Sequence, residues 1–221
     1  MASAEPGGLG GRDAMSTGPS SLDTGIAALK RDLLAEGGAR ISTMRNYNVA
    51  ILCYRPTEEF RLRQKVRGLS DEMRAEGWVV LSIDLHRLLF QRLRAHGDLI
   101  ESVVAREKSV FRRDPGRALK HLEGAILPEL EGQRGLASDV VRLVDEFAER
   151  ERDRLDRALV IVGRAGALYP FLRVSALLQN IQGHTRNIPL VILYPGERKG
   201  HTALSFMDQL TERDYRPRIY P

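Results

Sequence analysis

VVLSI at residues 79–83, ALVIV at 158–162 and PLVIL at 189–193 are the segments that decide the fold. Each is a nearly continuous apolar run, which is typical of strands covered on both faces of a sheet. The strands predicted from these runs span residues 78–83, 158–163 and 189–194, and two more are predicted over residues 48–54 and near 216–220. Helical patterns separate the strands, and strands joined through helices form right-handed crossovers. The sequence therefore predicts an α/β fold with a mostly parallel sheet flanked by helices.

The longest helical region lies between the second and third strands. Residues 85–94 and 98–150 carry apolar positions at helical spacing. Breaks are predicted at Asp114-Pro115, at Pro128 and around residues 132–135, because proline and glycine interrupt helices. We therefore expect a helical insertion between strands two and three.

Composition limits the class of protein and its compartment. The chain has 221 residues, of which 43% are hydrophobic and 29% charged, as in ordinary globular proteins. Residues 1–20 hold five glycines and two prolines, so we expect a disordered Gly/Pro-rich tail before a single α/β domain over residues 21–221. With one cysteine, Cys53, no internal disulfide forms. There is no signal-peptide pattern and no apolar run long enough to span a membrane, so a cytoplasmic protein without membrane association is expected.

The motifs of common catalytic sites are missing from the sequence. A phosphate-binding loop requires the pattern GxxxxGK[ST], but the chain contains no Gly-Lys dipeptide. The histidines are scattered, and there is neither an HExxH motif nor a cysteine pair for zinc. We therefore expect no catalytic residue, no metal site and no cofactor, and a protein that is not an enzyme.

One degenerate metal site stays open as an alternative. Asp84 ends the second strand, and Glu197 and Lys199 follow the fourth strand with the glutamate-x-lysine spacing of metal-dependent nucleases. Asp84 and Glu197 can share a metal ion only if strands two and four are neighbours. The competing interpretation makes Asp84 the cap of the next helix and places Glu197 and Lys199 in a solvated turn.

Positive charge is concentrated in one stretch. The net charge of the chain is +5, and residues 106–121 (REKSVFRRDPGRALKH) contain six lysines and arginines against two acidic residues. Clustered cations bind nucleic acid by releasing counterions from phosphates, so weak, non-specific DNA contact is one hypothesis. A solvated helix surface is the alternative. The candidate DNA-binding residues are Arg112, Arg113, Arg117 and Lys120.

Aromatic residues and prolines follow the third and fourth strands. The carboxyl ends of strands in an open α/β sheet form the edge where ligands and partners bind, and aromatic and arginine side chains are favoured anchors of interfaces. The candidate partner-binding residues are Tyr169, Pro170, Phe171, Arg173, Asn180, Gln182, Tyr194, Pro195 and Gly196. Alternatively, the two Tyr-Pro pairs close turns and pack on the sheet.

Four segments resemble a known family. They are VVLSIDLHRLL (79–89), GALYPFLRVSALLQNIQG (166–183), PLVILYPGERKG (189–200) and LSFMDQLTERDYRPRIYP (204–221). The strings YPFLR, LLxNIQ and YPGE, in this order and spacing, are similar to the BrxB family of bacterial BREX phage-defence systems. The similarity extends over roughly residues 22–221.

The resemblance implies a cytoplasmic protein within a multi-protein anti-phage assembly. Its usual neighbours there are a PglZ-type protein of the alkaline-phosphatase superfamily, the BrxC ATPase and a PglX-type adenine methyltransferase. The resemblance supplies no catalytic residue that can be carried over to this chain. The leading hypothesis is a non-catalytic adaptor subunit that docks onto other defence components through the Tyr/Pro-rich edge of the sheet. The alternative is a nucleic-acid-binding or metal-dependent nucleic-acid-processing protein in phage defence.

Overall fold

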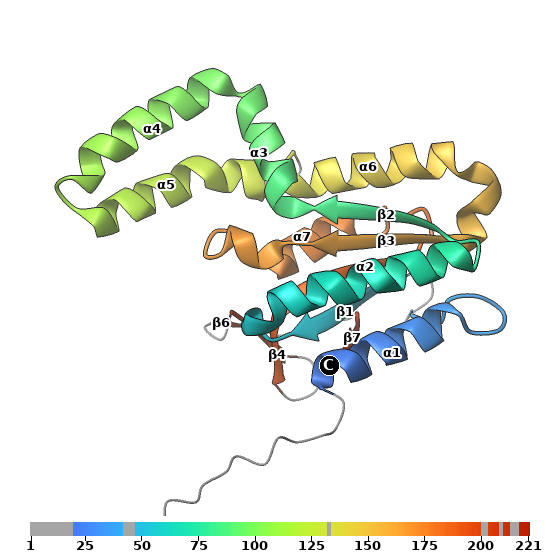
Figure 1. Ribbon diagram of the computed structural model, residues 1–221. Helices are drawn as coiled ribbons and strands as arrows, with labels where there is room; N and C mark the ends of the chain where they lie inside the picture. The colour runs from blue at the N-terminus through green and yellow to red at the C-terminus, as the bar shows by residue number, and fades with distance from the viewer. Residues whose placement is uncertain (1–19, 42–46, 132–133, 200–202, 208–209, 213–216) are drawn as a thin grey trace, which may run out of the picture.

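The fold is known from a computed structural model (Figure 1). The described residues are 20–41, 47–131, 134–199, 203–207, 210–212 and 217–221. Residues 1–19 of the predicted tail therefore lie outside the described part of the chain. Helix α1 begins directly afterwards at Ser21, and the Ser20 hydroxyl caps it by accepting a hydrogen bond from the Asp23 N–H at 3.3 Å.

A parallel sheet forms the centre of the molecule. Its strands and the strands attached to it are β1 (Val49–Tyr54), β2 (Val79–Asp84), β3 (Ala158–Gly163), β4 (Leu190–Lys199), β5 (Ala203–Phe206), β6 (Leu210–Glu212) and β7 (Arg218–Tyr220). The strand order is β2-β3-β4-β1-β7, and neighbouring strands in this order run parallel. The second half of β4 pairs with β5 in the antiparallel sense, and β5 pairs with β6.

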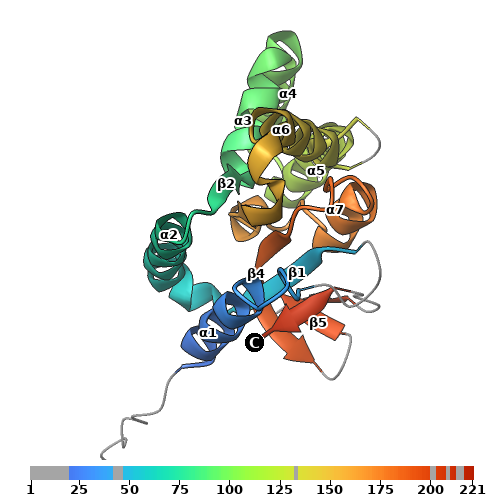
Figure 2. The same cartoon turned by 90° about the vertical axis from the view of Figure 1, so that its right-hand side faces the viewer.

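Helices cover both faces of this sheet (Figures 1 and 2). The α-helices are α1 (Ser21–Leu33), α2 (Glu59–Ala75), α3 (Leu85–Ala95), α4 (Gly97–Phe111), α5 (Pro115–Leu130), α6 (Leu136–Arg150) and α7 (Val174–Ile181), with short 3₁₀ helices η1 (Pro56–Glu58), η2 (Arg152–Arg157) and η3 (Ala165–Leu168). Helices α1 and α2 pack on one face, and α3, α6 and α7 pack on the other. No helix among the described residues is long and apolar enough to cross a membrane. Because α3 to α6 lie between the adjacent strands β2 and β3, the predicted α/β fold and its helical insertion are confirmed.

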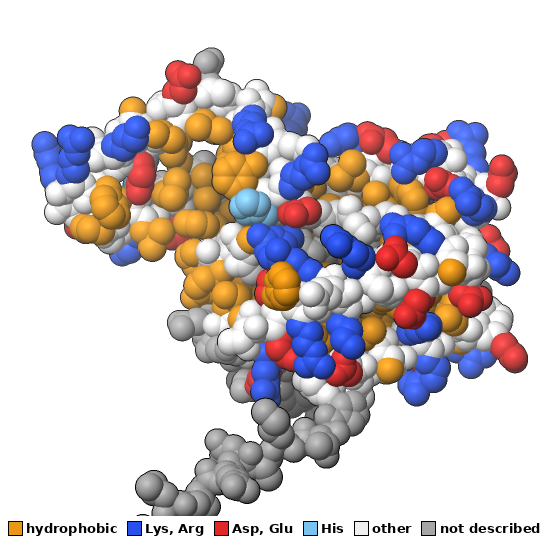
Figure 3. All heavy atoms as spheres, in the orientation of Figure 1, with side chains coloured by type: hydrophobic (Ala, Val, Ile, Leu, Met, Phe, Trp, Pro, Cys, Tyr) orange, Lys and Arg blue, Asp and Glu red, His pale blue; other side chains and the backbone are white. Residues whose placement is uncertain are grey.

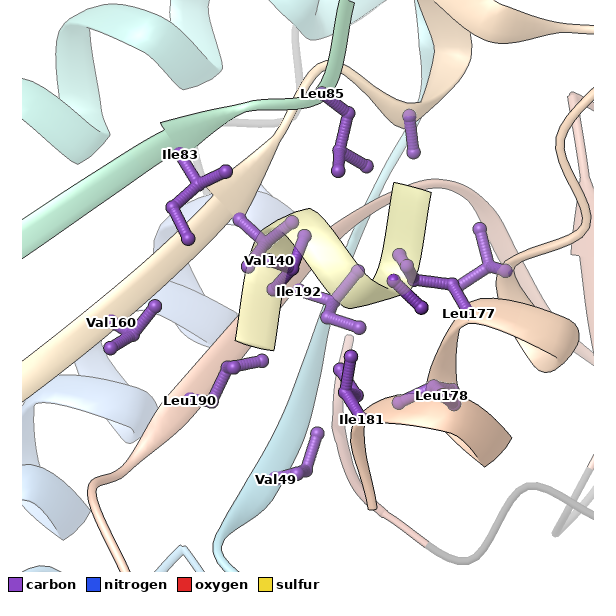
Figure 4. Packing of buried hydrophobic residues seen from close by; sticks show 14 of the residues in the cluster. Val49, Ile83, Leu85, Val140, Val160, Leu177, Leu178, Ile181, Leu190 and Ile192 are labelled. Atoms are coloured by element: carbon purple, nitrogen blue, oxygen red, sulfur yellow. The ribbon is translucent and has the colours of Figure 1, made fainter. Parts of the chain in front are cut away.

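The two faces of the sheet carry two separate apolar layers, because strand side chains alternate in direction. In β1, Val49 and Ile51 enter the layer of α6 and α7, whereas Ala50 and Leu52 enter the layer of α1 and α2. Figure 4 shows the first layer, where side chains from α6 and α7 meet those of four parallel strands. Each fully buried aliphatic side chain contributes about 1.5–3 kcal/mol to folding, so these layers hold the helices on the sheet.

The helix boundaries in the insertion follow local capping and packing. As predicted, α4 and α5 separate at Asp114-Pro115, where the Asp114 carboxylate accepts a hydrogen bond from the Arg117 N–H at 3.0 Å. The break predicted at Pro128 is wrong, since α5 continues to Leu130. Leu130 is buried in the core, and the Glu131 N–H bonds to a carbonyl of the preceding turn at 2.8 Å. These contacts offset the one hydrogen bond that Pro128 cannot donate.

Candidate functional site

The Tyr169-Pro170-Phe171 segment lies beyond the carboxyl end of β3, as predicted. It follows η3, and the peptide bond between Tyr169 and Pro170 is cis. Pro170 is exposed, whereas Tyr169 and Phe171 are half-buried against the core. The Tyr169 ring packs against Phe206 of β5 with ring centres 6.0 Å apart. The segment is thus partly exposed, and its role in partner binding stays a prediction.

Tyr194, Pro195 and Gly196 do not lie on an exposed edge. The fourth strand, predicted to end at Tyr194, extends to Lys199 because β5 pairs with its second half. All three residues are buried, and the Tyr194 ring packs edge-on against Phe206 with ring centres 5.3 Å apart. The prediction that they line an exposed docking edge is therefore wrong. The continuation of β4 was not predicted, because the charged residues after Gly196 interrupt the hydrophobic pattern. Strands β5 and β6 were not predicted either.

The other candidate residues of this edge belong to α7 and its two ends. Arg173 is exposed, but its Nε and Nη2 donate to the two carboxylate oxygens of Glu131 at 2.7 and 2.5 Å. The Asn180 side chain donates to the Ala176 carbonyl within α7 at 2.8 Å. Gln182 is exposed at the end of the helix. Arg173 therefore links the start of α7 to the end of α5 through this ion pair and is not a free, solvated charge.

The two carboxylates of the alternative metal site are far apart. Strand β3 lies between β2 and β4, so Asp84 and Glu197 are separated by at least two strand spacings, about 10 Å. Asp84 caps α3 by accepting a hydrogen bond from the Arg87 N–H at 2.9 Å, which confirms the cap interpretation. Glu197 lies in β4, not in the predicted turn, and accepts a hydrogen bond from the Arg55 side chain at 3.1 Å. No group of three or more metal-ligating side chains occurs among the described residues.

Aromatic side chains gather in the middle of β4, where the strand leaves the parallel sheet. In doubly wound folds, ligands occupy a crevice at the carboxyl ends of the strands. Here β4 continues past the parallel sheet with β5 alongside it, and Phe206 packs against both Tyr169 and Tyr194. Gly196 is equally enclosed, since a Cβ there would lie 1.7 Å from the Ser205 carbonyl oxygen. The geometry therefore indicates that this aromatic cluster stabilises the packing of β4 against β5 and does not line a ligand crevice.

Helices α4 and α5 form a hairpin, which we name the arm (residues 97–130), that projects past the carboxyl ends of the strands (Figure 1). Among the described side chains, α4 contributes none that is buried, and α5 contributes only Ala118 and Leu130. Helices in proteins are stabilised mainly by packing an apolar face, so a helix pair with this little burial is marginal by itself. The arm therefore has an incomplete core.

The base of the arm is attached to the body of the protein. Arg92 of α3 donates from Nε to Glu129 of α5 at 2.7 Å and from Nη1 to Asp139 of α6 at 2.8 Å. All three side chains are largely buried. Hydrogen-bonded guanidinium–carboxylate pairs have a defined geometry, so these contacts set the direction in which the arm leaves the sheet.

One face of the arm exposes large apolar side chains. Val104 and Phe111 of α4 are 43% and 58% exposed, and Leu119 of α5 is 48% exposed. Each directly follows a more buried residue of its helix, so each is rotated by about 100° from the line of contact between the two helices. Because the two helices are antiparallel, this rotation places the exposed side chains of both helices on the same face of the arm. Figure 3 shows apolar side chains on the side of the arm that faces the viewer. Phe90 of α3, which is 46% exposed, belongs to the same helical insertion.

The candidate DNA-binding cations come together near the tip of the arm. Arg112 and Arg113 lie at the turn between the helices, Arg117 and Lys120 follow in the first turns of α5, and all four are exposed. Figure 3 shows cationic side chains at this tip. Their contact with DNA stays a prediction.

A comparison with protein families matches the chain to the model described as BREX protein BrxB over residues 81–219, more than half of its length. The chain belongs to the BrxB family. The predicted resemblance is thereby confirmed, although the match begins at β2 and not at residue 22. No curated protein and no solved structure matches the chain. The arm lies wholly within the part that matches BrxB.

The apolar face of the BrxB-family arm was not among the predicted site residues. The sequence prediction selected the cations of the stretch 106–121 but not Phe111 and Leu119 within it. Val104 and Phe111 are separated by two helical turns, which is a readable signal for a shared face. Whether another element covers that face depends on tertiary structure, so the sequence pattern alone assigns it to a core as readily as to a surface.

Proposed function

We propose that this BrxB-family protein is a non-catalytic adaptor of a BREX anti-phage assembly and that the arm is its docking surface. The observation that carries the proposal is the uncovered apolar face of the arm, formed by Val104, Phe111 and Leu119. Contiguous exposed apolar patches on proteins mark interaction sites. A partner that covers this face would supply the burial that α4 lacks in the isolated chain.

The combination of apolar and arginine side chains favours a protein partner. Protein interfaces are enriched in aromatic residues and arginine, whereas DNA-binding surfaces are more polar and contact phosphates. Phe111 directly precedes Arg112 and Arg113 at the tip of the arm. Nucleic-acid contact remains the second candidate function, favoured by the exposed cations alone, and it would be salt-sensitive and independent of base sequence.

Membership in the BrxB family supports association with other BREX components. The partners we propose are the PglZ-type protein, the BrxC ATPase and the PglX-type methyltransferase, with the cytoplasm as the compartment. Exposed Pro170 and its half-buried neighbours Tyr169 and Phe171 offer a second contact area. Arg173 and Gln182 would contribute to that area from the ends of α7.

Pairwise co-expression tests the docking proposal. The tagged protein is expressed with each of the three proposed partners, and we expect stable co-purification with at least one. The double variant Phe111→Ser/Leu119→Ser should reduce the captured partner by at least about tenfold, because buried apolar anchors dominate interface energies. Phe60→Ser is the control, since Phe60 is 73% exposed on α2, outside the arm.

Three results would count against the docking proposal. Equal capture by wild type and the arm variant would exclude the arm as the docking surface. Equal losses in the arm variant and in the Phe60 control would show that the effect is not specific to the arm. Absence of a complex with all three components would contradict the adaptor function itself.

We propose further that the protein is not an enzyme. The purified chain should neither hydrolyse ATP nor cleave DNA in the presence of Mg²⁺ or Mn²⁺. The reason is the absence of a phosphate-loop motif from the sequence together with the separation of Asp84 from Glu197. Turnover that is abolished by Asp84→Ala or Glu197→Ala would overturn this proposal.

A further inference from the structure

The parallel sheet ends in two different edge strands. At one edge β7 has three residues, and very short edge strands limit unwanted pairing. At the other edge β2 has six residues, and its sequence VVLSID contains no proline, lysine or arginine. Figure 2 shows β2 at the margin of the molecule, between α2 and α3. Strand β2 therefore lacks the features that usually protect an edge strand from pairing with another chain.

The outer side of β2 carries backbone groups that are free to pair. On its inner side β2 pairs with β3 along its whole length. An edge strand presents a row of N–H and C=O groups on its other side. For residues 79–83, no hydrogen bond joins these outer groups to another element within the part of the chain that the structure describes. They are thus available to a strand from another molecule.

The helices cover β2 less completely than they cover its neighbour. Residues 158–162 of β3 are all buried, whereas Val80 and Leu81 of β2 are half-buried and Ser82 is exposed. Val80 packs against the layer of α1 and α2, and Leu81 against the layer of α6 and α7. A strand added beside β2 would bury more of both side chains, because cross-strand neighbours pack on each face of a sheet. Apolar contact would thus add to the backbone hydrogen bonds.

A groove of about 560 Å³ lies beside this edge, between α2 and the sheet. Ser82 of β2 lines it from the sheet, and Arg67 and Arg74 line it from α2. Lys65 and Glu72 of α2 make ion pairs with α1. Each arginine follows one of these two residues by two positions, a rotation of about 200° around the helix. The arginines therefore lie on the side of α2 away from α1, toward the uncovered strand β2.

The lining of the groove has a net positive charge, since it contains four arginines and two carboxylates. Both carboxylates are engaged: Glu59 accepts hydrogen bonds from two of the arginines, and Asp84 caps α3. Arg74 pairs with the exposed Asp71 on its own helix at 3.0 Å. Arg67 makes no ion pair with any described residue. A surface with this excess of cations attracts an acidic partner.

We propose that β2 binds an extended segment of a partner protein as an additional strand of the sheet, with acidic side chains of that segment in contact with Arg67 and Arg74. In this mode of recognition main-chain hydrogen bonds supply affinity and alternate side chains supply specificity. The proposal rests on the adaptor function and adds a second docking site, so that the protein can hold two components at once. A second copy of the chain fits less well, because antiparallel pairing of two β2 strands would bring the arginines of both α2 helices to the same face.

Hydrogen exchange measured by mass spectrometry tests the backbone contact. Peptides that cover residues 79–83 are followed in the free protein and in its complex with each BREX component that co-purifies. We expect fast exchange of the outward amides in the free protein and at least about tenfold slower exchange in one complex. Unchanged exchange of this segment in every complex would overturn strand addition. Slow exchange of the outward amides in a free protein that is dimeric by light scattering would show that a second copy fills the edge, and the proposal would fail.

Two variants test the charge of the segment. Arg67→Glu and Ser82→Glu each place an anion in the groove at an exposed position, so we expect at least about fivefold weaker binding of the component that protects β2. Ser82→Ala is the control for the second variant. Arg40→Glu is the control for the first, since Arg40 is also exposed and makes no ion pair with a described residue. Both controls should bind within about twofold of the wild type.

The outcomes separate this proposal from the adaptor function. Lost binding in Phe111→Ser/Leu119→Ser, with unchanged exchange at β2, would overturn the added strand and leave the adaptor function in place. A complex that protects β2 but tolerates both charge variants would overturn the acidic chemistry of the segment. If these variants lose affinity for duplex DNA and keep the protein complex, the groove serves nucleic acid and the proposal fails. The absence of any complex would overturn the adaptor function as well.

Discussion

Gly196 lies at a close approach of β4 and β5. A Cβ built there would lie 1.7 Å from the Ser205 carbonyl oxygen and 2.9 Å from Cε1 of Tyr194. We expect Gly196→Ala to lower the free energy of unfolding by about 1–3 kcal/mol, because overpacking forces the backbone to shift. Gly68→Ala in α2 is the matched control. It meets no atom within 4 Å and should raise stability by about 0.5–1 kcal/mol, since alanine favours a helix interior. Urea unfolding of both variants checks this, and equal stabilities would contradict the close approach.

Cys53 gives a prediction about chemical reactivity. Its side chain is buried in β1, and burial raises the pKa of the thiol to about 12. The thiolate is the reactive form, so below this pKa the thiol stays neutral and unreactive. We expect a thiol reagent near neutral pH to modify Cys53 only after the protein is unfolded with guanidinium. Rapid, complete modification of the folded protein would contradict its burial.

Arg173 illustrates how a partner changes the expected effect of a substitution. A solvated arginine tolerates charge reversal, but the Arg173 guanidinium donates to both carboxylate oxygens of Glu131. Arg173→Glu would place two carboxylates together, and we expect a loss of about 1 kcal/mol. The swapped variant Arg173→Glu/Glu131→Arg should recover most of that loss, because it restores the pair. Thermal melts of the three proteins measure the recovery, and its absence would show that the pair contributes nothing to stability.

At the level of elements, the arm should be separable from the fold. Within residues 104–122, Ala118 is the one buried side chain that the structure describes. Replacing these residues with a short Gly/Ser linker therefore removes little buried apolar area, and we expect stability to stay within about 1 kcal/mol of the wild type. The same variant should lose its partner in co-purification. A collapsed melt would show that the arm is part of the folding core.

Elements with a self-contained pattern are the ones that the sequence predicts well. Strand β3 has its predicted bounds, Ala158–Gly163, because its apolar run is continuous and buried on both faces. The second half of β4 is different, since residues 196–199 lie beyond the last pair with β1 and form a strand by pairing with β5. Local charge likewise makes Arg112 and Arg113 readable as a cationic group. The exposure of Phe111 and the burial of Tyr194 depend on which other segment covers them, and no local pattern contains that information.

At the level of the whole molecule, the two apolar layers should unfold together. The parallel strands contribute side chains to both layers, so neither layer can lose its packing while the other stays intact. Trp78 is the only tryptophan, and it lies in the layer of α1 and α2. We expect its fluorescence and the far-ultraviolet circular dichroism to give the same midpoint in urea. Two transitions separated in urea concentration would show that the layers are independent.

The strand order also determines how long the nascent chain must wait before its sheet can assemble. Strand β1 lies between β4 and β7, yet residues 55–189 separate it from β4 in the sequence. At translation rates of roughly 5–20 residues per second, β1 leaves the ribosome on the order of ten seconds before either neighbour has been synthesised. During this interval its apolar side chains and its unpaired backbone groups are open to aggregation or to capture by chaperones. Strand β1 is thus made before the other strands that the structure describes, yet it stays unpaired until β4 and β7 have followed it.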